Sequence, residues 1–120
     1  MYSDDDPYLT ELRKVCLALP EATEVESWGR PTFRAGKIFA VFSGIEDRPH
    51  GVIFKPEAGE RAALAADERF YPPPYWGPGG WLALDFGAAP VDWSEVAELV
   101  EGSYRQVALK RMIAGLEARD

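Results

Sequence analysis

The sequence contains one cysteine, Cys16, and one histidine, His50. A lone cysteine cannot form an internal disulfide, so we expect a reducing, cytoplasmic setting. A serine or cysteine nucleophile needs a neighbouring base. His50 falls in a turn between two predicted strands, and Cys16 falls on the apolar side of a predicted helix. We therefore expect no catalytic residues and a protein that is not an enzyme.

Long hydrophobic runs are also missing. No apolar stretch approaches the roughly 18 residues that a membrane-spanning helix requires. The first nine residues are acidic and lack the basic and apolar regions of a signal peptide. The chain has 120 residues, 47% of them hydrophobic and 28% charged. These values predict a single globular domain over residues 1–120 that does not associate with membranes.

Positive charge is scarce, since the net charge is −7. This value argues against a protein that coats nucleic acid by bulk attraction. The charge is uneven, however: residues 27–56 carry +3, whereas residues 1–26 and 57–120 carry −5 each. The central segment could focus an anionic ligand, or its cations could simply solvate an exposed sheet face.

That central segment has the pattern of an antiparallel sheet. Three short apolar runs, at 31–35, 37–43 and 51–55, are separated by glycine-containing turns, which predicts a meander. In the second run, alternation places Ile38, Ala40 and Phe42 on one face and Phe39 and Val41 on the other. A further strand is predicted at 81–86, and any strand within 21–27 should be weak or lie at an edge.

Helices are predicted near both ends. The acidic residues before Pro7 suit a helix start, and Pro20 ends that helix. Asp92, with Glu95 three residues later, predicts the cap of a C-terminal helix. The apolar spacing changes phase near residues 106–109, so we predict a break there and a separate last helix. A short helix is expected within 57–66.

Two common kinds of ligand site are not favoured. Acidic residues at 4–6 and 11, or at 21, 24 and 26, could gather oxygen ligands for a cation. Neither set has the spacing of a defined metal loop, so a solvated acidic face is favoured. The glycines at 77, 79 and 80 resemble no phosphate-binding loop, because the prolines among them remove amide donors. We expect no metal and no cofactor.

Basic and aromatic side chains form the remaining candidates. The aromatic residues of the proline-rich segment could offer a stacking platform for a base, or could fix that segment to the core. Cations on the strands and at the predicted helix break could converge on a phosphate or carboxylate. The candidate platform is Tyr75, Trp76 and Trp81, and the candidate anion-binding residues are Arg34, Lys37, Lys55, Ser103, Tyr104, Lys110 and Arg111.

Several short motifs, in order along nearly the whole chain, resemble the MmcQ/YjbR family of small bacterial proteins. They are Leu19-Pro20, Trp28-Gly29-x-Pro31-x-Phe33-Arg34, Gly36-Lys37-x-Phe39-Ala40, Phe54-Lys55-Pro56, the segment from Tyr75 to Trp81, and Ser103-Tyr104-x-x-Val107 with Lys110-Arg111. One departure is Ala108-Leu109, where the family pattern has a proline.

The resemblance implies a CyaY-like α+β fold, in which N- and C-terminal helices pack on one face of a twisted antiparallel sheet. It also implies DNA binding, which is a fold-level analogy. The function we expect is therefore non-enzymatic binding of nucleic acid through a basic sheet face. The alternative is a module that binds a partner protein or a small anion. For the oligomeric state we expect a monomer.

Overall fold

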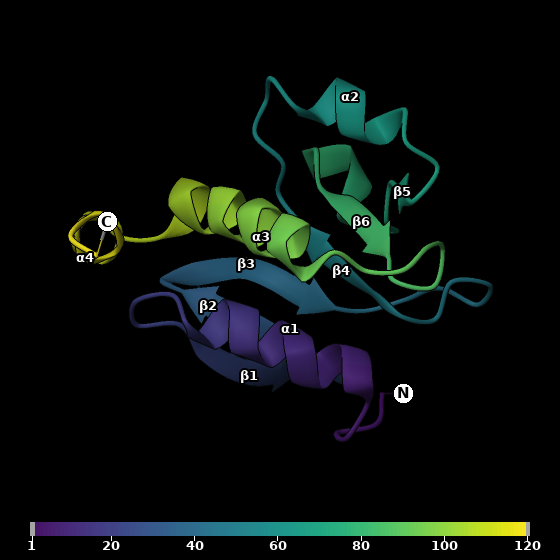
Figure 1. Ribbon diagram of the computed structural model, residues 1–120, viewed down its shortest axis with the longest axis horizontal. Helices are drawn as coiled ribbons and strands as arrows, with labels where there is room; N and C mark the ends of the chain where they lie inside the picture. Colours follow the sequence, from purple (N-terminus) through teal and green to yellow (C-terminus); the bar gives the residue numbers. More distant parts are fainter. Residues whose placement is uncertain (1, 120) are drawn as a thin grey trace.

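The computed structural model describes residues 2–119, and within them the chain forms one six-stranded antiparallel sheet (Figure 1). The strand order is β1-β2-β3-β4-β6-β5. The strands are β1 Thr23–Ser27, β2 Arg30–Ala35, β3 Lys37–Phe42, β4 Gly51–Phe54, β5 Phe70–Tyr71 and β6 Leu82–Asp85. The predicted meander is confirmed, and β1 is the edge strand that its polar sequence indicated. The two-residue strand β5 was not predicted.

The helices begin and end close to the predicted positions. They are α1 Pro7–Leu17, α2 Arg61–Ala65, α3 Trp93–Val107 and α4 Lys110–Glu117, with a 3₁₀ turn, η1, at Gly77–Gly79. The Asp6 carboxylate accepts the amide of Tyr8, and the Asp92 carboxylate accepts the first free amides of α3. Glu95 does not complete a capping box, because its carboxylate binds Arg69. The break before α4 is confirmed.

One face of the sheet carries the main core. Helices α1 and α3 lie side by side across this face, and α4 lies at one end of the sheet (Figure 1). The buried residues of α1 and α3 interlock with those of the central strands, which gives the α+β arrangement that the family resemblance implied. This core consists of Leu9, Leu12, Cys16, Phe33, Ala35, Phe39, Ala40, Phe42, Val52, Phe54, Phe70, Leu82, Leu84, Phe86, Val96, Val100, Tyr104, Met112 and Leu116.

The opposite face is covered only in its middle. Val41, Ile53 and Ala83 form a small second cluster there. The loop between β5 and β6 crosses this cluster and places aromatic side chains on it. The partly buried residues packed against the cluster are Ile38, Tyr71, Trp76 and Trp81.

A β-bulge in β3 changes the faces that simple alternation predicted. Phe33 pairs with Ala40 and Arg34 pairs with Ile38, so Phe39 has no partner on β2. The extra residue lets Phe39 and Ala40 both face the main core. Phe39 packs edge-on against Tyr104, with ring centroids 5.5 Å apart. The prediction that Phe39 shares a face with Val41 was therefore wrong.

None of the helices in the described part of the chain is long and apolar enough to cross a lipid bilayer.

Candidate nucleic-acid interface

A single row of side chains crosses the sheet on the side away from α1 and α3, and we call this side the open face. Residues paired across antiparallel strands share a face, so the strand register identifies the row. From β1 to β5 it comprises Val25, Thr32, Val41, Ile53, Ala83 and Tyr71. The centre of the row is the second cluster, formed by Val41, Ile53 and Ala83. Positively charged side chains lie along both sides of the row.

Three cations flank this row. Arg34 pairs with Ile38, which packs on the second cluster. Lys55 follows the core residue Phe54, so alternation turns its side chain to the open face. Arg30 stands two residues before Thr32 and therefore lies on the same face, on the other flank of the row. Arg34 and Lys55 are two strands apart, which is about 10 Å.

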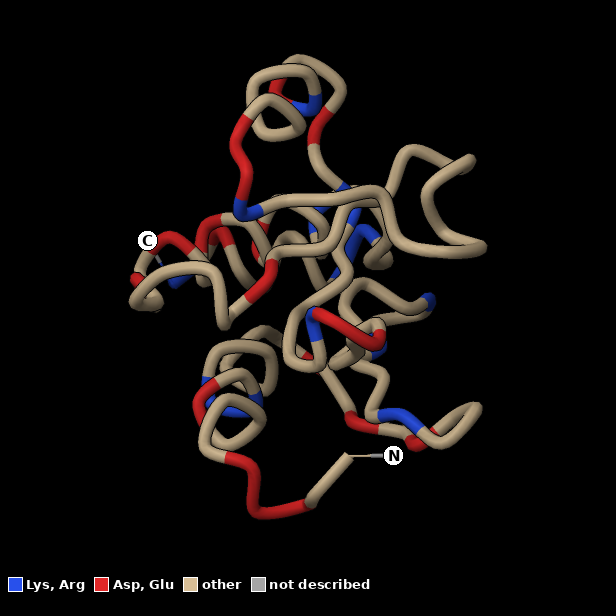
Figure 2. Tube along the Cα trace, turned by 90° about the vertical axis from the view of Figure 1, so that its right-hand side faces the viewer, with Lys and Arg blue, Asp and Glu red and all other residues tan. Residues whose placement is uncertain are grey.

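These cations have no acidic partner in residues 2–119. No carboxylate oxygen of those residues lies within 4.0 Å of the charged nitrogens of Arg30, Arg34 or Lys55. Arg34 instead donates to the hydroxyls of Thr32 and Ser27, at 3.2 and 2.7 Å. Most acidic positions lie on the helix side of the molecule, at the left of Figure 2. The three cations therefore keep their capacity to bind an external anion.

Three of the predicted basic residues lie elsewhere. Lys37 pairs with the core residue Ala35, so it leaves the sheet on the helix side. Lys110 and Arg111 begin α4 at the end of the sheet (Figure 1). The Arg111 guanidinium is bound by Glu21 at 2.9 Å, and this contact raises the pKa of Arg111 and lowers that of Glu21. Of the predicted basic set, only Arg34 and Lys55 meet on the open face.

Ser103 and Tyr104 are fully buried and serve the fold rather than a ligand. The Ser103 hydroxyl donates to the carbonyl of Phe39 at 2.6 Å and accepts the amide of Lys55 at 2.9 Å. In a regular antiparallel ladder the Phe39 carbonyl and the Lys55 amide would face each other directly. The bulge opens a gap between them, and the Ser103 hydroxyl bridges it. The Tyr104 hydroxyl donates to the carbonyl of Pro20 at 2.8 Å. Both predicted ligand-binding side chains therefore lie inside the core and not on the open face.

The predicted aromatic platform divides into packed and exposed rings. Trp76 and Trp81 lie edge-to-face with ring centroids 4.9 Å apart, and both rest on the second cluster. Tyr75 is 97% exposed. The loop that carries these rings has no charged residue between Phe70 and Trp81. Two rings thus attach the loop to the sheet, while the third is free to contact a ligand.

Sequence reasoning missed Trp28, which is 74% exposed at the tip of the β1–β2 hairpin. Its ring lies edge-on to Trp76, with centroids 6.5 Å apart. Ser27 pairs with Arg30, so Trp28 and Gly29 form a two-residue turn, and both have positive φ, 55° and 73°. Such turns favour Asn-Gly or Gly-Gly. A non-glycine residue in the left-handed region costs about 1–2 kcal/mol. The two-residue spacing between strands was the signal that could have located this turn.

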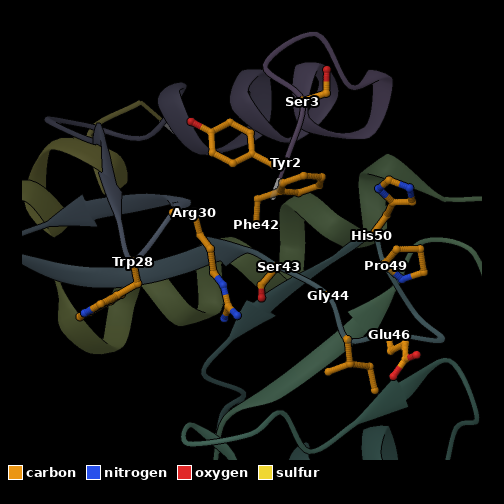
Figure 3. Close-up of a pocket in the computed structure, with 12 residues that line it drawn as sticks. Tyr2, Ser3, Trp28, Arg30, Phe42, Ser43, Gly44, Glu46, Pro49 and His50 are labelled. Carbon is orange, nitrogen blue, oxygen red and sulfur yellow. The ribbon is translucent and has the colours of Figure 1, made fainter.

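A hollow of about 660 Å³ opens beside this turn. Figure 3 shows the Arg30 side chain next to Ser43, with Tyr2 and Phe42 above them. His50 lines the opposite wall, where its Nδ1 lies 3.0 Å from the Asp6 carboxylate. A second hollow, over Ile53 and Tyr71, also has Arg30 in its wall. Arg30 therefore stands between two recesses, of which the second lies on the open face, a place the sequence did not reveal.

Other chemical groups give no site of their own. Burial raises the pKa of the Cys16 thiol well above its usual range, so this thiol stays protonated. Among residues 2–119, no group of three or more His, Cys, Asp or Glu side chains is arranged to hold a metal ion. The open face is consequently the candidate binding surface.

Comparison with known proteins agrees with this fold. The YjbR family profile matches residues 17–106. The crystal structure of Deinococcus radiodurans protein DR2400, which carries a DUF419 domain, superposes with a TM-score of 0.72 at 20% sequence identity. That match covers 91% of this chain and 87% of the other. No curated protein matches the chain significantly. Because the family profile covers most of the sequence, the chain belongs to the YjbR family.

Proposed function

We propose that this protein binds nucleic acid through the open face, without a catalytic step. The observation that carries the proposal is the placement of Arg30, Arg34 and Lys55 on one side of the sheet without acidic partners among residues 2–119. Phosphate groups are the natural counter-charge for such a set, and arginine binds them through a planar fork of donors.

The shape of the face supports an extended ligand. Arg34 and Lys55 lie on one flank of the row and Arg30 on the other, so the cations span the face instead of closing on one point. A small anion would need them to converge within hydrogen-bond distance of a common centre. A chain of phosphates can instead meet them one after another.

The net charge of −7 limits the affinity of this protein for nucleic acid. The acidic helices repel a polyanion, and few cations on the face oppose that repulsion. They are Arg30, Arg34, Lys55 and Arg48, whose guanidinium lies over the Tyr71 ring at 4.9 Å. We therefore expect modest affinity, which depends steeply on salt because each phosphate contact releases a condensed counterion.

The lone histidine is occupied by structural contacts, which favours binding over catalysis. Besides its contact with Asp6, His50 packs between the rings of Tyr8 and Phe42, at centroid distances of 5.4 and 6.4 Å. A general base must reach a proton on its substrate, and these contacts hold the His50 ring against the N-terminus of α1, across the hollow from Arg30.

Fluorescence anisotropy with a labelled mixed-sequence oligonucleotide tests the proposal. With three phosphate contacts, we expect the logarithm of the affinity to fall with the logarithm of salt concentration with a slope of about −2 for a single strand. An affinity that does not change with salt, or no binding at about 20 mM salt, would contradict it. The second outcome would leave a partner protein or a small anion as the ligand class.

A further inference from the structure

The two most exposed aromatic side chains of the chain lie around the open face. Trp28 is 74% exposed at the hairpin tip beside Arg30, and Tyr75 is 97% exposed in the loop that covers the second cluster. Tyr75 and Arg30 line the same recess, over Ile53. An exposed ring next to an unpaired cation combines a surface for stacking with a contact for phosphate.

Both rings are carried by backbone of an unusual conformation. Trp28 and Tyr75 have φ values of 55° and 67°, in the left-handed region that side chains of this size rarely adopt. Neither ring gains burial in exchange, since both remain mostly in solvent. Strained residues of this kind cluster at ligand-binding sites, where the surrounding structure holds them in place.

Trp28 also has a firm support. Trp28 contacts Trp76, and Trp76 contacts Trp81, the residue immediately before β6. This series of edge-on contacts connects the hairpin tip to the sheet through the covering loop. A stacking surface that is already ordered loses little conformational entropy when a ligand binds.

We propose that Trp28 and Tyr75 stack on unpaired bases, so that the nucleic acid bound by the open face is single-stranded rather than duplex. This inference rests on the proposed function and specifies its ligand. Duplex DNA hides the faces of its bases and carries a high charge density, which the acidic chain repels. A single strand offers its bases to exposed rings, and stacking adds affinity that three cations alone do not provide.

The variants Trp28→Asn and Tyr75→Asn test this inference without disturbing the fold. Asparagine tolerates left-handed backbone, so we expect the melting temperature of each variant to stay the same or rise by about 3 °C. Each substitution should weaken binding of a labelled single-stranded 12-mer by roughly tenfold, while the salt slope stays unchanged. Leu17→Asn, on an exposed apolar residue of α1, is the matched control and should leave the affinity unchanged.

The outcomes separate the two proposals. Wild-type protein should bind the single strand at least tenfold more tightly than the corresponding duplex. Equal or tighter binding of the duplex, or full affinity in both asparagine variants, would overturn the stacking proposal and leave the proposed function in place. Failure of the wild type to bind either form would remove the proposed function as well, and would favour a protein partner for the exposed rings.

Discussion

Exchanging Arg30 and Lys55 together for glutamate is expected to weaken nucleic-acid binding about 100-fold at low salt. Each substitution removes one phosphate contact and adds a repulsive charge, so we expect roughly tenfold from each position. The fold should persist, because the Arg30 side chain is exposed and neither charged group has a carboxylate partner in residues 2–119. Anisotropy titration of the two single variants and the double variant measures the effect.

Lys14→Glu is the matched control for this experiment. Lys14 lies on α1, on the helix side of the sheet, and its ammonium contacts Glu11 at 3.0 Å. The substitution changes the net charge by the same amount as either single variant on the open face. If Lys14→Glu weakens binding as much as Lys55→Glu does, the loss of affinity is caused by the change in net charge, and the open face has no special role.

Substituting Ser103 by alanine is expected to lower the free energy of unfolding by about 3 kcal/mol. The Ser103 hydroxyl satisfies the Phe39 carbonyl and the Lys55 amide at the bulge, where no strand neighbour can replace it. A buried donor or acceptor left unpaired costs about 1–3 kcal/mol. For a domain of this size the change corresponds to a fall in melting temperature of about 10 °C, which thermal unfolding measures.

Ser94→Ala provides the comparison for this second prediction. Ser94 lies in the first turn of α3 and is exposed, and the cap of that helix comes from the carboxylate of Asp92. We expect Ser94→Ala to change stability by less than about 0.5 kcal/mol. A Ser103→Ala protein as stable as Ser94→Ala would mean that a water molecule or a shifted backbone satisfies Phe39 and Lys55.

The fold could be predicted from local sequence signals in most places. Glycine-containing turns marked the meander, Asp92 marked the start of α3, and the change of apolar phase marked the break before α4. The bulge at Phe39 could not be predicted, because one extra residue in a strand leaves the apolar pattern looking regular. That single residue changed the face assigned to Phe39, and it also explains why Ser103 is buried at the sheet.

The candidate site was harder to predict, since it depends on which face each strand residue takes. Lys37 and Lys55 look equivalent in the sequence, yet the strand register turns Lys37 to the helix side and Lys55 to the open face. Arg111 looked free, but the fold brings Glu21 to it from 90 positions earlier. Trp28 was assigned no role in a site from the sequence, and the hairpin places it at an exposed tip.

Chemical-shift mapping tests most directly whether the open face is the binding surface. Adding a short single-stranded oligonucleotide to isotope-labelled protein at low salt should shift the indole N–H of Trp28 and the amides around Arg34 and Lys55. The amides of α1 should remain unchanged. Shifts concentrated on α1 and α3, or spread evenly over both sides of the sheet, would contradict the account.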